Sequence, residues 1–479
     1  MAVLEHLEPG KVFHFFEEIS AIPRGSTNTK KISDWCVAFA KARGLEYYQD
    51  SLNNVIIIKE ATPGYEKAEP VILQGHLDMV CEKAPDCIKD MEKEGIDLVI
   101  DGDRIRAKGT TLGGDNGIAV AMALAVLDAG DLAHPRVEAV FTIDEEIGML
   151  GAIDLDMSPL KGRRLINIDS EEEGIFTVSC AGGNTTRCRL PFTCEPFAGT
   201  VMEITVGGML GGHSGAEIDK RRANASMLLG RLLYSIKKKS EIRLITVDGG
   251  KKDNAIPREA HALIAVADAD AVRTAAAEMQ ETFRFEYQTA DPDIFVKLQT
   301  VSTEGVPMDA LSTAKVINML VCLPNGIQEM SADIEGLVQT SLNLGVLLTE
   351  EQTVLASFCV RSSIATQKQM LVDRLACQME LLGGDINIYG DYPGWEYKQD
   401  SALRDLMVRI FEKQYGYAPQ ISAIHAGLEC GMFMGKLPDL DCISIGPDMT
   451  EVHTYRESMS ISSIQRVWGF LTEVLKCSK

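Results

Sequence analysis

The sequence predicts an α/β protein of two domains, for three reasons. Its 479 residues exceed the ~250 to 300 at which a single hydrophobic core stops growing. Apolar runs typical of buried strands alternate with helical periodicity up to about residue 184 and again from about residue 395, as in a sheet covered by helices. Between these parts, pairs of strands separate the helices, which indicates an inserted α+β domain over 185–394. The first domain would therefore be discontinuous, with 1–184 and 395–479 folding together.

Helical and strand patterns follow one another in the N-terminal part of the first domain. The predicted helices cover 12–19, 30–42 and 118–129, and the predicted strands cover 55–59, 71–80, 136–143 and 164–168. Helices are assigned where apolar residues recur three and four positions apart, and strands where short apolar runs lie between turn residues. Ser26 or Thr27 is the candidate cap of the second helix, and Asp101-Gly102-Asp103 predicts a hairpin turn.

The inserted domain shows the order strand, helix, strand, strand, helix, strand, which predicts a split βαβ unit of the ferredoxin-like kind. Its strands are expected at 201–206, 242–247, 259–266 and 294–300, and its helices at 221–236 and 271–286. The order then recurs without a visible sequence repeat, with helices at 310–323 and 367–382 and strands at 337–344, 353–360 and 386–389. After residue 395 the first pattern returns, with helices at 402–415 and 461–477, a strand at 442–445 and a glycine-rich turn at 427–431.

The composition excludes several classes of partner. A formal net charge of −22 disfavours nucleic acids and anionic membranes. No apolar run approaches the ~18 residues of a membrane span, and the N-terminus lacks the basic and apolar segments of a signal peptide. The 12 cysteines are scattered and form no CxxC pair, which favours reduced thiols over a disulfide framework or a thiolate zinc site. We therefore expect a cytoplasmic protein that binds neither nucleic acids nor membranes.

The strand predicted at 71–80 carries the first sign of chemistry, in His76 and Asp78. Alternate residues of a strand share a face, so the Asp78 carboxylate can hold one ring nitrogen of His76. The other nitrogen is then free to bind a metal, and a carboxylate behind a ligating histidine is the usual arrangement at such sites. The alternative is a satisfied His–Asp pair with no further role.

Further acidic residues follow the next predicted strands. Glu145 and Glu146 end one of them, Asp169 ends another, and Asp115 lies in a glycine-rich loop at a helix entrance. That loop lacks the lysine and the spacing of a phosphate-binding loop. Ligands bind at the carboxyl ends of strands in open α/β sheets, so Glu145, Glu146 and Asp169 should converge with His76 on one edge. The alternative for the paired glutamates is a solvated acidic turn.

Seven motifs in this order resemble those of the co-catalytic zinc peptidases of the M20 family. They are His76-Leu-Asp78, Gly113-Gly-Asp-Asn-Gly117, Asp144-Glu-Glu-Ile-Gly148, Asn167-Ile-Asp169, Gly212-His-Ser-Gly215, Asn254-Ala-Ile-Pro257 and the late His453. The resemblance covers essentially the whole chain and is strongest to the bacterial aminoacyl-histidine dipeptidases of that family. It implies a zinc-peptidase-like catalytic domain, with a central mixed sheet flanked by helices, and an inserted lid domain that also forms a dimer.

The resemblance also implies a metal site with two Zn²⁺ ions per chain. Asp115 would bridge the ions, Glu146 and His453 would complete the shell of one, and His76 and Asp169 that of the other. Nitrogen and oxygen ligands without sulfur suit zinc, with Mn²⁺ or Co²⁺ able to substitute. For His453, a surface histidine without function is the alternative.

The implied reaction is the hydrolysis of dipeptides, including Xaa-His dipeptides such as β-Ala-His, by a water shared between the ions. Glu145 would be the general base, and Asp78 would support the catalytic site behind the metal ligand. His213 would polarise the scissile carbonyl, from its own chain or from a partner subunit. Asn254 and Arg361 would bind substrate, and Arg361 is suited to grip a C-terminal carboxylate. A plain structural role is the alternative for Arg361.

Other functions of the same fold stay open at this point. They are an N-acyl-amino-acid deacylase, a tripeptidase, and a metal-binding relative that has lost catalysis, although the intact Glu145 argues against the last. The expected partners are small peptide substrates and a second copy of the chain in a homodimer. The acidic run at 171–173 is expected to be a solvated turn.

Overall fold

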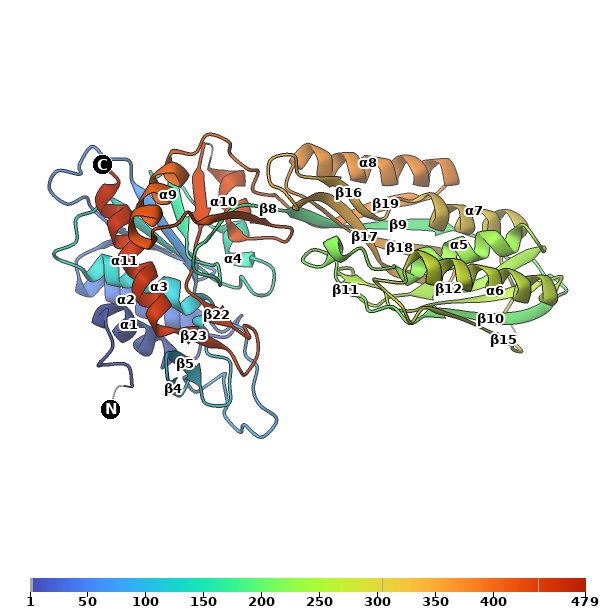
Figure 1. Cartoon of the computed structure of the whole chain (residues 1–479), viewed down its shortest axis with the longest axis horizontal. Helices are drawn as coiled ribbons and strands as arrows, with labels where there is room; N and C mark the ends of the chain where they lie inside the picture. The colour runs from blue at the N-terminus through green and yellow to red at the C-terminus, as the bar shows by residue number, and fades with distance from the viewer. Residues whose placement is uncertain (1–2, 304, 438) are drawn as a thin grey trace. The chain divides into compact units, whose positions relative to one another are not determined.

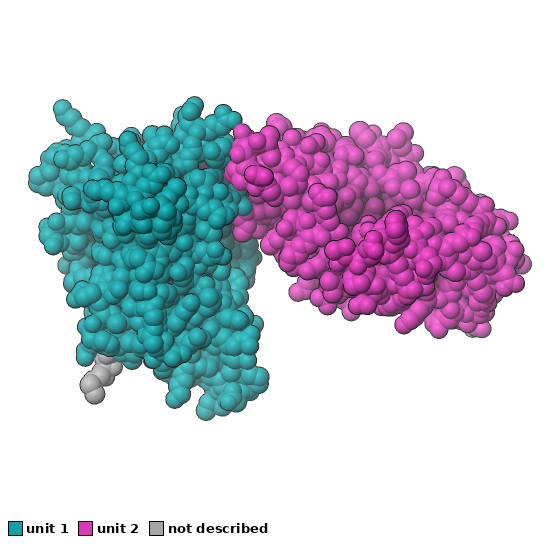
Figure 2. Space-filling model, viewed as in Figure 1, with its two compact units in different colours: residues 1–179, 397–423, 428–479 teal, residues 180–396, 424–427 magenta. Residues whose placement is uncertain are grey.

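The structure is a computed structural model that describes residues 3–303, 305–437 and 439–479. The chain divides into two compact units (Figure 2). Unit 1 comprises Met1–Ser179, Tyr397–Ala423 and Leu428–Lys479, and unit 2 comprises Cys180–Glu396 and Ile424–Gly427. Among the described residues, no helix has the length and apolar character needed to cross a membrane.

Unit 1 is built on an eight-stranded mixed sheet (Figure 1). In spatial order its strands are β1 (Glu46–Gln49), β2 (Val55–Lys59), β6 (Val137–Thr142), β3 (Val71–His76), β7 (Arg164–Asn167), β21 (Asp441–Ser444), β8 (Ile175–Cys180) and β20 (Gln420–Ile424). The four central strands β6, β3, β7 and β21 run parallel. All six residues of β3 are buried, as expected of a parallel strand covered on both faces. The predicted mixed α/β fold is confirmed.

Helices and a small second sheet complete unit 1. The helices are α1 (Gly10–Ser20), α2 (Lys30–Ala42), α3 (Gly114–Asp128), α4 (Leu150–Asp154), α9 (Ala402–Tyr415), α10 (Glu429–Lys436) and α11 (Ile461–Cys477). The second sheet has the order β22 (Met449–Thr450), β23 (Ser458–Ser460), β5 (Arg104–Ala107) and β4 (Leu98–Asp101). This sheet ties the C-terminal part of the chain to the predicted hairpin, which β4 and β5 form.

Several predicted boundaries in unit 1 are wrong. Strand β3 ends at His76, four residues before the predicted end at 80, and the Asp78 side chain beyond it accepts N–H groups from a neighbouring turn. Helix α3 is assigned from Gly114, but Asp115 and Asn116 have non-helical backbone angles, so the regular helix begins close to the predicted start at 118. The glycine-rich segment 427–431 is partly helical, since α10 begins at Glu429.

The predicted cap of α2 is also wrong. Thr29 stands at the cap position, and its side chain makes no capping hydrogen bond. The hydroxyl of Ser26 instead donates to Asp78 Oδ2 at 2.8 Å. The backbone N–H of Thr27 donates to Asp144 Oδ1 at 2.6 Å. These polar groups therefore hold acidic residues near the strand ends rather than starting the helix.

Unit 2 contains a nine-stranded antiparallel sheet (Figure 1). Its main path runs β15 (Phe295–Thr300), β10 (Thr200–Gly207), β14 (Ala260–Val266), β12 (Ile242–Gly249), β17 (Val338–Thr349), β18 (Thr353–Ser362), β9 (Gly182–Pro191) and β19 (Asp385–Tyr392), with β16 (Gly326–Met330) beside β17. Strands β12 and β17 join the two predicted halves. The sequence did not predict β9. This strand precedes both predicted halves in the chain, but it pairs with β18 and β19 of the second half.

Four helices share one hydrophobic core with this sheet. They are α5 (Ala225–Lys237), α6 (Ala269–Glu286), α7 (Ala310–Cys322) and α8 (Ala365–Leu382). The predicted start of α5 at 221 is wrong, because Arg221 has a left-handed backbone with φ 51°. The helix begins after Asn224, whose side chain accepts from the N–H groups of Ser226 and Met227. The short strands β11 (Gly212–His213) and β13 (Ala255–Ile256) form a separate pair.

All twelve cysteines are free thiols, some buried and some exposed.

Candidate active site

The parallel register of unit 1 brings the predicted strand-end residues to one edge. His76 at the end of β3 is level with Thr142 at the end of β6, and Gln74 is level with Asn167 at the end of β7. The segment carrying Glu145 and Glu146 follows β6, and Asp169 follows β7. Asp115 is in the first turn of α3, and His453 is in the loop between β22 and β23. This register agrees with the predicted convergence of His76, Glu145, Glu146 and Asp169 at one edge.

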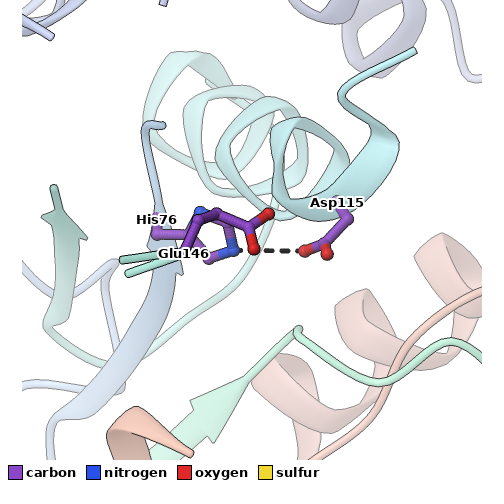
Figure 3. A group of neighbouring side chains, drawn as sticks. All are labelled: His76, Asp115 and Glu146. Carbon is purple, nitrogen blue, oxygen red and sulfur yellow. Dashed lines mark hydrogen bonds and ion pairs between the residues drawn. The ribbon is translucent and has the colours of Figure 1, made fainter. Parts of the chain in front are cut away.

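His76 contacts two of the acids. Its Nε2 lies 3.1 Å from Asp115 Oδ1 and 3.6 Å from Asp169 Oδ1. Its Nδ1 lies 3.4 Å from Asp78 Oδ1 and 3.1 Å from the Asp78 backbone oxygen. Figure 3 shows the His76 ring from β3 directed towards Asp115 at the start of α3, with Glu146 beside them.

His453 makes a second, matching set of contacts. Its Nε2 lies 3.0 Å from Asp115 Oδ2 and 3.0 Å from Glu146 Oε2. The two oxygens of Asp115 therefore face different histidines. Glu146 Oε1 is buried and makes no hydrogen bond within the described residues.

This donor set fits divalent cations. One ligand atom each from His76, Asp115 and Glu146 lies within 4.8 Å of the others. Imidazole and carboxylate donors suit zinc and related ions. The buried Oε1 of Glu146 has lone pairs that a bound cation would accept. The two histidine–carboxylate groups share Asp115.

The electrostatics agree with a cation site. Burial raises the pKa of the Asp169 carboxyl to about 6, although the His76 ring lowers it. Hydrogen bonds to Asp115 and Glu146 raise the pKa of His453 to about 11. Burial lowers the pKa of His76, but hydrogen bonds to Asp115, Asp169 and Asp78 outweigh it and raise the pKa well above the ordinary value. Without a metal, protons supply the positive charge that these acids require.

Asp78 holds both His76 and the acidic turn. Its Oδ1 accepts the Glu145 N–H at 3.1 Å, and its Oδ2 accepts the Glu146 N–H at 3.3 Å and the Ser26 hydroxyl at 2.8 Å. One fully buried carboxylate thus fixes a histidine and orients two adjacent glutamates. The alternative of a solvated acidic turn does not fit this pair, since Asp78 anchors both backbone N–H groups and the Glu146 side chain is only 5% exposed.

Glu145 has the properties of a proton acceptor. Burial raises the pKa of its carboxyl well above the ordinary range.

Glu429 lies near Glu145 and was not singled out from the sequence. It is fully buried and accepts hydrogen bonds from the Thr142 hydroxyl at 2.7 Å and from Gln74. Burial raises the pKa of Glu429 to about 7. Glu429 is the first residue of α10, and no local sequence pattern indicated that its side chain would be buried near Glu145.

The run 171–173 is the predicted solvated turn only in part, because Glu171 and Glu172 are exposed but Glu173 is not. The side chain of Glu173 is only 7% exposed and forms a two-point ion pair with Arg466 at 2.7 and 2.5 Å. Burial raises the pKa of Glu171 to about 7, with further contributions from the charges of Asp115 and Asp169. Packing against α11 and proximity to the acidic site, both set by the fold, explain the difference.

The three predicted substrate residues all lie in unit 2. Strands β11 and β13 pair His213 with Ala255, next to Asn254. His213 Nδ1 accepts from the N–H groups of Gly215 at 3.2 Å and Ala216 at 3.0 Å. The neutral ring therefore carries its proton on Nε2, which can donate. Burial and the charge of Arg361 lower the pKa of His213, which favours this neutral form.

Arg361 lies on β18 and is only 7% exposed. Its Nη1 donates to the Tyr392 hydroxyl at 3.1 Å, while its Nε makes no hydrogen bond within the described residues. Asn254, Arg361 and Tyr392 all line a cavity of about 450 Å³. A buried guanidinium with an unused N–H next to a cavity is suited to bind an anionic group.

Gly215 and His425 complete this cluster. A Cβ at Gly215 would lie 3.0 Å from His213 Cε1, 3.2 Å from Arg361 Cζ and 2.5 Å from the His425 backbone oxygen. Glycine thus permits the close approach of the His213 and Arg361 side chains. The His425 ring contacts the Ser341 hydroxyl at 2.7 Å through Nε2. The sequence drew attention to the loop near Gly427 but to no side chain in it.

Comparisons with known proteins extend these observations. A family model described as peptidase family M20/M25/M40 matches residues 72–476. The chain is 37% identical over 480 residues to a cytosol non-specific dipeptidase of Escherichia coli (strain K12), with 99% of each chain covered. It is similar to the crystal structure of an aminoacylhistidine dipeptidase from Vibrio alginolyticus, with a TM-score of 0.94, 36% identity, and coverage of 99% and 98%.

A more distant structure shares the fold alone. Aminopeptidase PepT from Bacillus cereus ATCC 10987 matches with a TM-score of 0.56 and 14% identity, covering 98% of this chain and 99% of that one.

Proposed function

The chain belongs to peptidase family M20/M25/M40, and from this premise we propose that it is a metal-dependent dipeptidase. Its substrates would be dipeptides, including those with a C-terminal histidine such as β-Ala-His. The names of two similar proteins, a cytosol non-specific dipeptidase and an aminoacylhistidine dipeptidase, support this substrate class. The observation that carries the proposal is the division of the Asp115 oxygens between His76 and His453.

We assign two zinc ions to this site, with manganese or cobalt able to replace them. His76 and Asp169 would hold one ion, Glu146 and His453 the other, and Asp115 both. When bound, a pair of such cations lowers the pKa of a water held between them. The unused buried oxygen of Glu146 supports the assignment.

Glu145 is the proposed general base. It accepts the proton that the attacking water loses as the new C–O bond forms. It then passes that proton to the amine nitrogen as the C–N bond breaks. Its raised pKa suits a group that must both take and return a proton near neutral pH. Asp78 accepts the N–H groups of Glu145 and Glu146. This anchor would direct the Glu146 side chain to the metals and the Glu145 side chain to the water.

Recognition of the substrate is assigned to the cluster in unit 2. The His213 Nε2–H would donate to the carbonyl oxygen as negative charge develops on it. Arg361 would bind the C-terminal carboxylate and Asn254 would add an amide hydrogen bond. In a dipeptide the C-terminal carboxylate is one residue from the scissile bond. If Arg361 must bind the carboxylate at that distance, longer peptides would be excluded.

The test is hydrolysis of a substrate panel by the protein stripped with a chelator and then restored with zinc or manganese. The panel contains β-Ala-His, other dipeptides, tripeptides, tetrapeptides and N-acyl-amino acids. Activity that is confined to dipeptides, disappears with the metal and returns with it is the expected result. Faster cleavage of N-acyl-amino acids or tripeptides than of dipeptides would indicate a deacylase or a tripeptidase instead. Binding of two metals without any hydrolysis would indicate a non-catalytic relative.

We also propose that the protein acts in the cytoplasm as a homodimer. The printed name of the Escherichia coli relative and the twelve free thiols support the compartment. The dimer rests on the family resemblance. Light scattering of the purified protein gives its mass, and a mass of 52.3 kDa would correspond to a monomer instead.

A further inference from the structure

Glu457 is a buried carboxylate that accepts four backbone hydrogen bonds from one loop. Its Oε2 accepts from Leu112 at 2.7 Å and Gly113 at 2.9 Å, and its Oε1 accepts from Gly114 at 2.8 Å and Asp115 at 3.2 Å. These N–H groups lie at the start of α3, where no helical partner exists for them. A concave row of N–H groups of this kind favours an anion.

Arg24 holds the same loop from its other side. Its Nη2 donates to the Gly113 carbonyl at 2.5 Å. Its Nη1 donates to the carbonyls of Leu77 at 2.9 Å and Asp78 at 3.2 Å, just beyond the end of β3. Arg24 is 1% exposed. A carboxylate on the N–H side and a guanidinium on the C=O side therefore fix the backbone on which Asp115 is carried.

The loop leaves no space for side chains between these two groups. A Cβ at Gly113 would lie 2.6 Å from Arg24 Nη2, and Gly113 has φ of +66°, where side chains are disfavoured. A Cβ at Gly114 would lie 2.5 Å from Met459 Sδ. The two glycines are thus required for the loop to approach Arg24 and Glu457.

We propose that Glu457 is a positioning residue that sets the metal affinity of the site by fixing Asp115 relative to His453. It is four residues after His453 in the chain, and it hydrogen-bonds the backbone of Asp115, 342 positions away. One side chain therefore joins the two segments whose ligand atoms meet at 3.0 Å. The inference rests on the proposed metal-dependent function and goes beyond its ligand set.

The carboxylate is required because all four partners are donors. In Glu457→Gln, one acceptor oxygen becomes an NH₂ group that faces two N–H groups, so those two hydrogen bonds are lost. The loop must then move away, and Asp115 moves with it. In Glu457→Asp, both acceptors remain but on a side chain one methylene shorter, so part of the arrangement survives.

Glu138 provides a matched control. It is fully buried, and it too accepts backbone N–H groups, from Lys161 at 3.0 Å to each oxygen and from Gly162 at 3.0 Å. Its Oε1 also accepts from Arg136 at 2.8 Å. Glu138 is near the start of β6, whereas the acidic turn with Glu145 follows the end of that strand. Glu138→Gln therefore damages a similar anchor away from the proposed ligands.

The experiment compares zinc affinity by chelator competition in the wild-type protein, Glu457→Gln, Glu457→Asp and Glu138→Gln. Circular dichroism and thermal unfolding of the metal-free proteins report the fold. We expect Glu457→Gln to weaken zinc binding about 10- to 100-fold, the range typical of residues that support a ligand. Glu457→Asp should lie between it and the wild type, and Glu138→Gln should lower the unfolding temperature while its affinity stays within about twofold.

A second readout separates positioning from catalysis. Because every proposed ligand and Glu145 are intact in Glu457→Gln, excess zinc should restore kcat for a dipeptide to within a few-fold of the wild type. Glu457→Gln with wild-type zinc affinity would overturn the inference, as would an equal loss of affinity in Glu138→Gln. If Glu457→Gln does not fold, unchanged affinity in Glu457→Asp overturns it. A wild-type protein that binds no zinc would overturn the proposed function itself, and this inference with it.

Discussion

His453 Nε2 lies 3.0 Å from Asp115 Oδ2, although 338 positions of the chain separate the two residues. His76 approaches the other oxygen of the same carboxylate at 3.1 Å. Asp115 therefore occupies the centre of the site, and only a carboxylate can present two equivalent oxygens to two such groups. Several measurable consequences follow from this geometry.

Asp115→Asn should prevent two metal ions from binding together, because the amide offers one acceptor oxygen where two are needed. Glu146→Gln should weaken one ion more than the other, since Glu146 forms its ion pair with His453, at 3.0 Å. Metal analysis after dialysis gives the number of ions per chain. A loss of affinity of more than about 100-fold is expected for Asp115→Asn, beyond the effect of residues that merely support ligands. Two ions retained in Asp115→Asn would contradict the bridging role.

Glu145→Gln should lower kcat about 10²- to 10⁴-fold for a dipeptide while both metals stay bound, because proton transfer is lost but no ligand is. Steady-state kinetics and metal analysis on the same sample test this. Glu172→Gln is the control, since Glu172 is an exposed glutamate three positions after the proposed ligand Asp169. Equal activity of Glu145→Gln and the wild type would exclude the general-base role.

Arg361→Lys should lower kcat/KM for dipeptides about 10- to 100-fold, as expected when hydrogen bonds to a charged group are lost. The effect should be mainly on KM and should nearly vanish with dipeptide amides, which lack the carboxylate. Tyr392→Phe removes only the hydroxyl that accepts a hydrogen bond from Arg361, and it should lower kcat/KM a few-fold. An equal effect of Arg361→Lys on dipeptides and their amides would indicate a structural role.

His425 should make the stability of the protein depend on pH. Burial lowers the pKa of its ring from 6.5 to about 3, with a smaller contribution from the charge of Arg361. The unfolded chain therefore binds the proton more readily than the folded one. The stabilisation is complete above pH 6.5 and is lost as the pH falls towards 3.

Between pH 7 and pH 5 this single group should lower the free energy of unfolding by about 2 kcal/mol. Denaturant unfolding at both pH values, in the wild type and in His425→Gln, gives the difference. The variant should show a pH dependence that is smaller by that amount. An identical pH dependence in the two proteins would mean that His425 is protonated in the folded state.

Much of unit 1 could be predicted from the sequence because its signals are local. The apolar run of β3, the alanine-rich α3 and the acids after β6 and β7 each show their structure within a few residues. Parallel strands bring their carboxyl ends to one edge, so His76, Glu146 and Asp169 could be expected to meet before any coordinates existed. The family resemblance derived from the seven motifs is confirmed by the match over 72–476.

What the sequence could not give are the relationships that depend on long-range packing. Strand β9 belongs to a half of the sheet whose other members follow more than a hundred residues later, and no local pattern records that pairing. Ser26 has the appearance of a helix cap, but in the fold its hydroxyl serves Asp78 instead.

The sequence by itself determined the fold class, the family and the residue types of the metal site, because these depend on periodicity and on short motifs. Only the tertiary structure decided that Asp115 divides its oxygens between two histidines and that Glu457 and Arg24 hold the loop beneath it. The physical reason is that a buried charged group is stable only when its partners surround it. In this protein those partners come from segments that the chain brings together only when it folds.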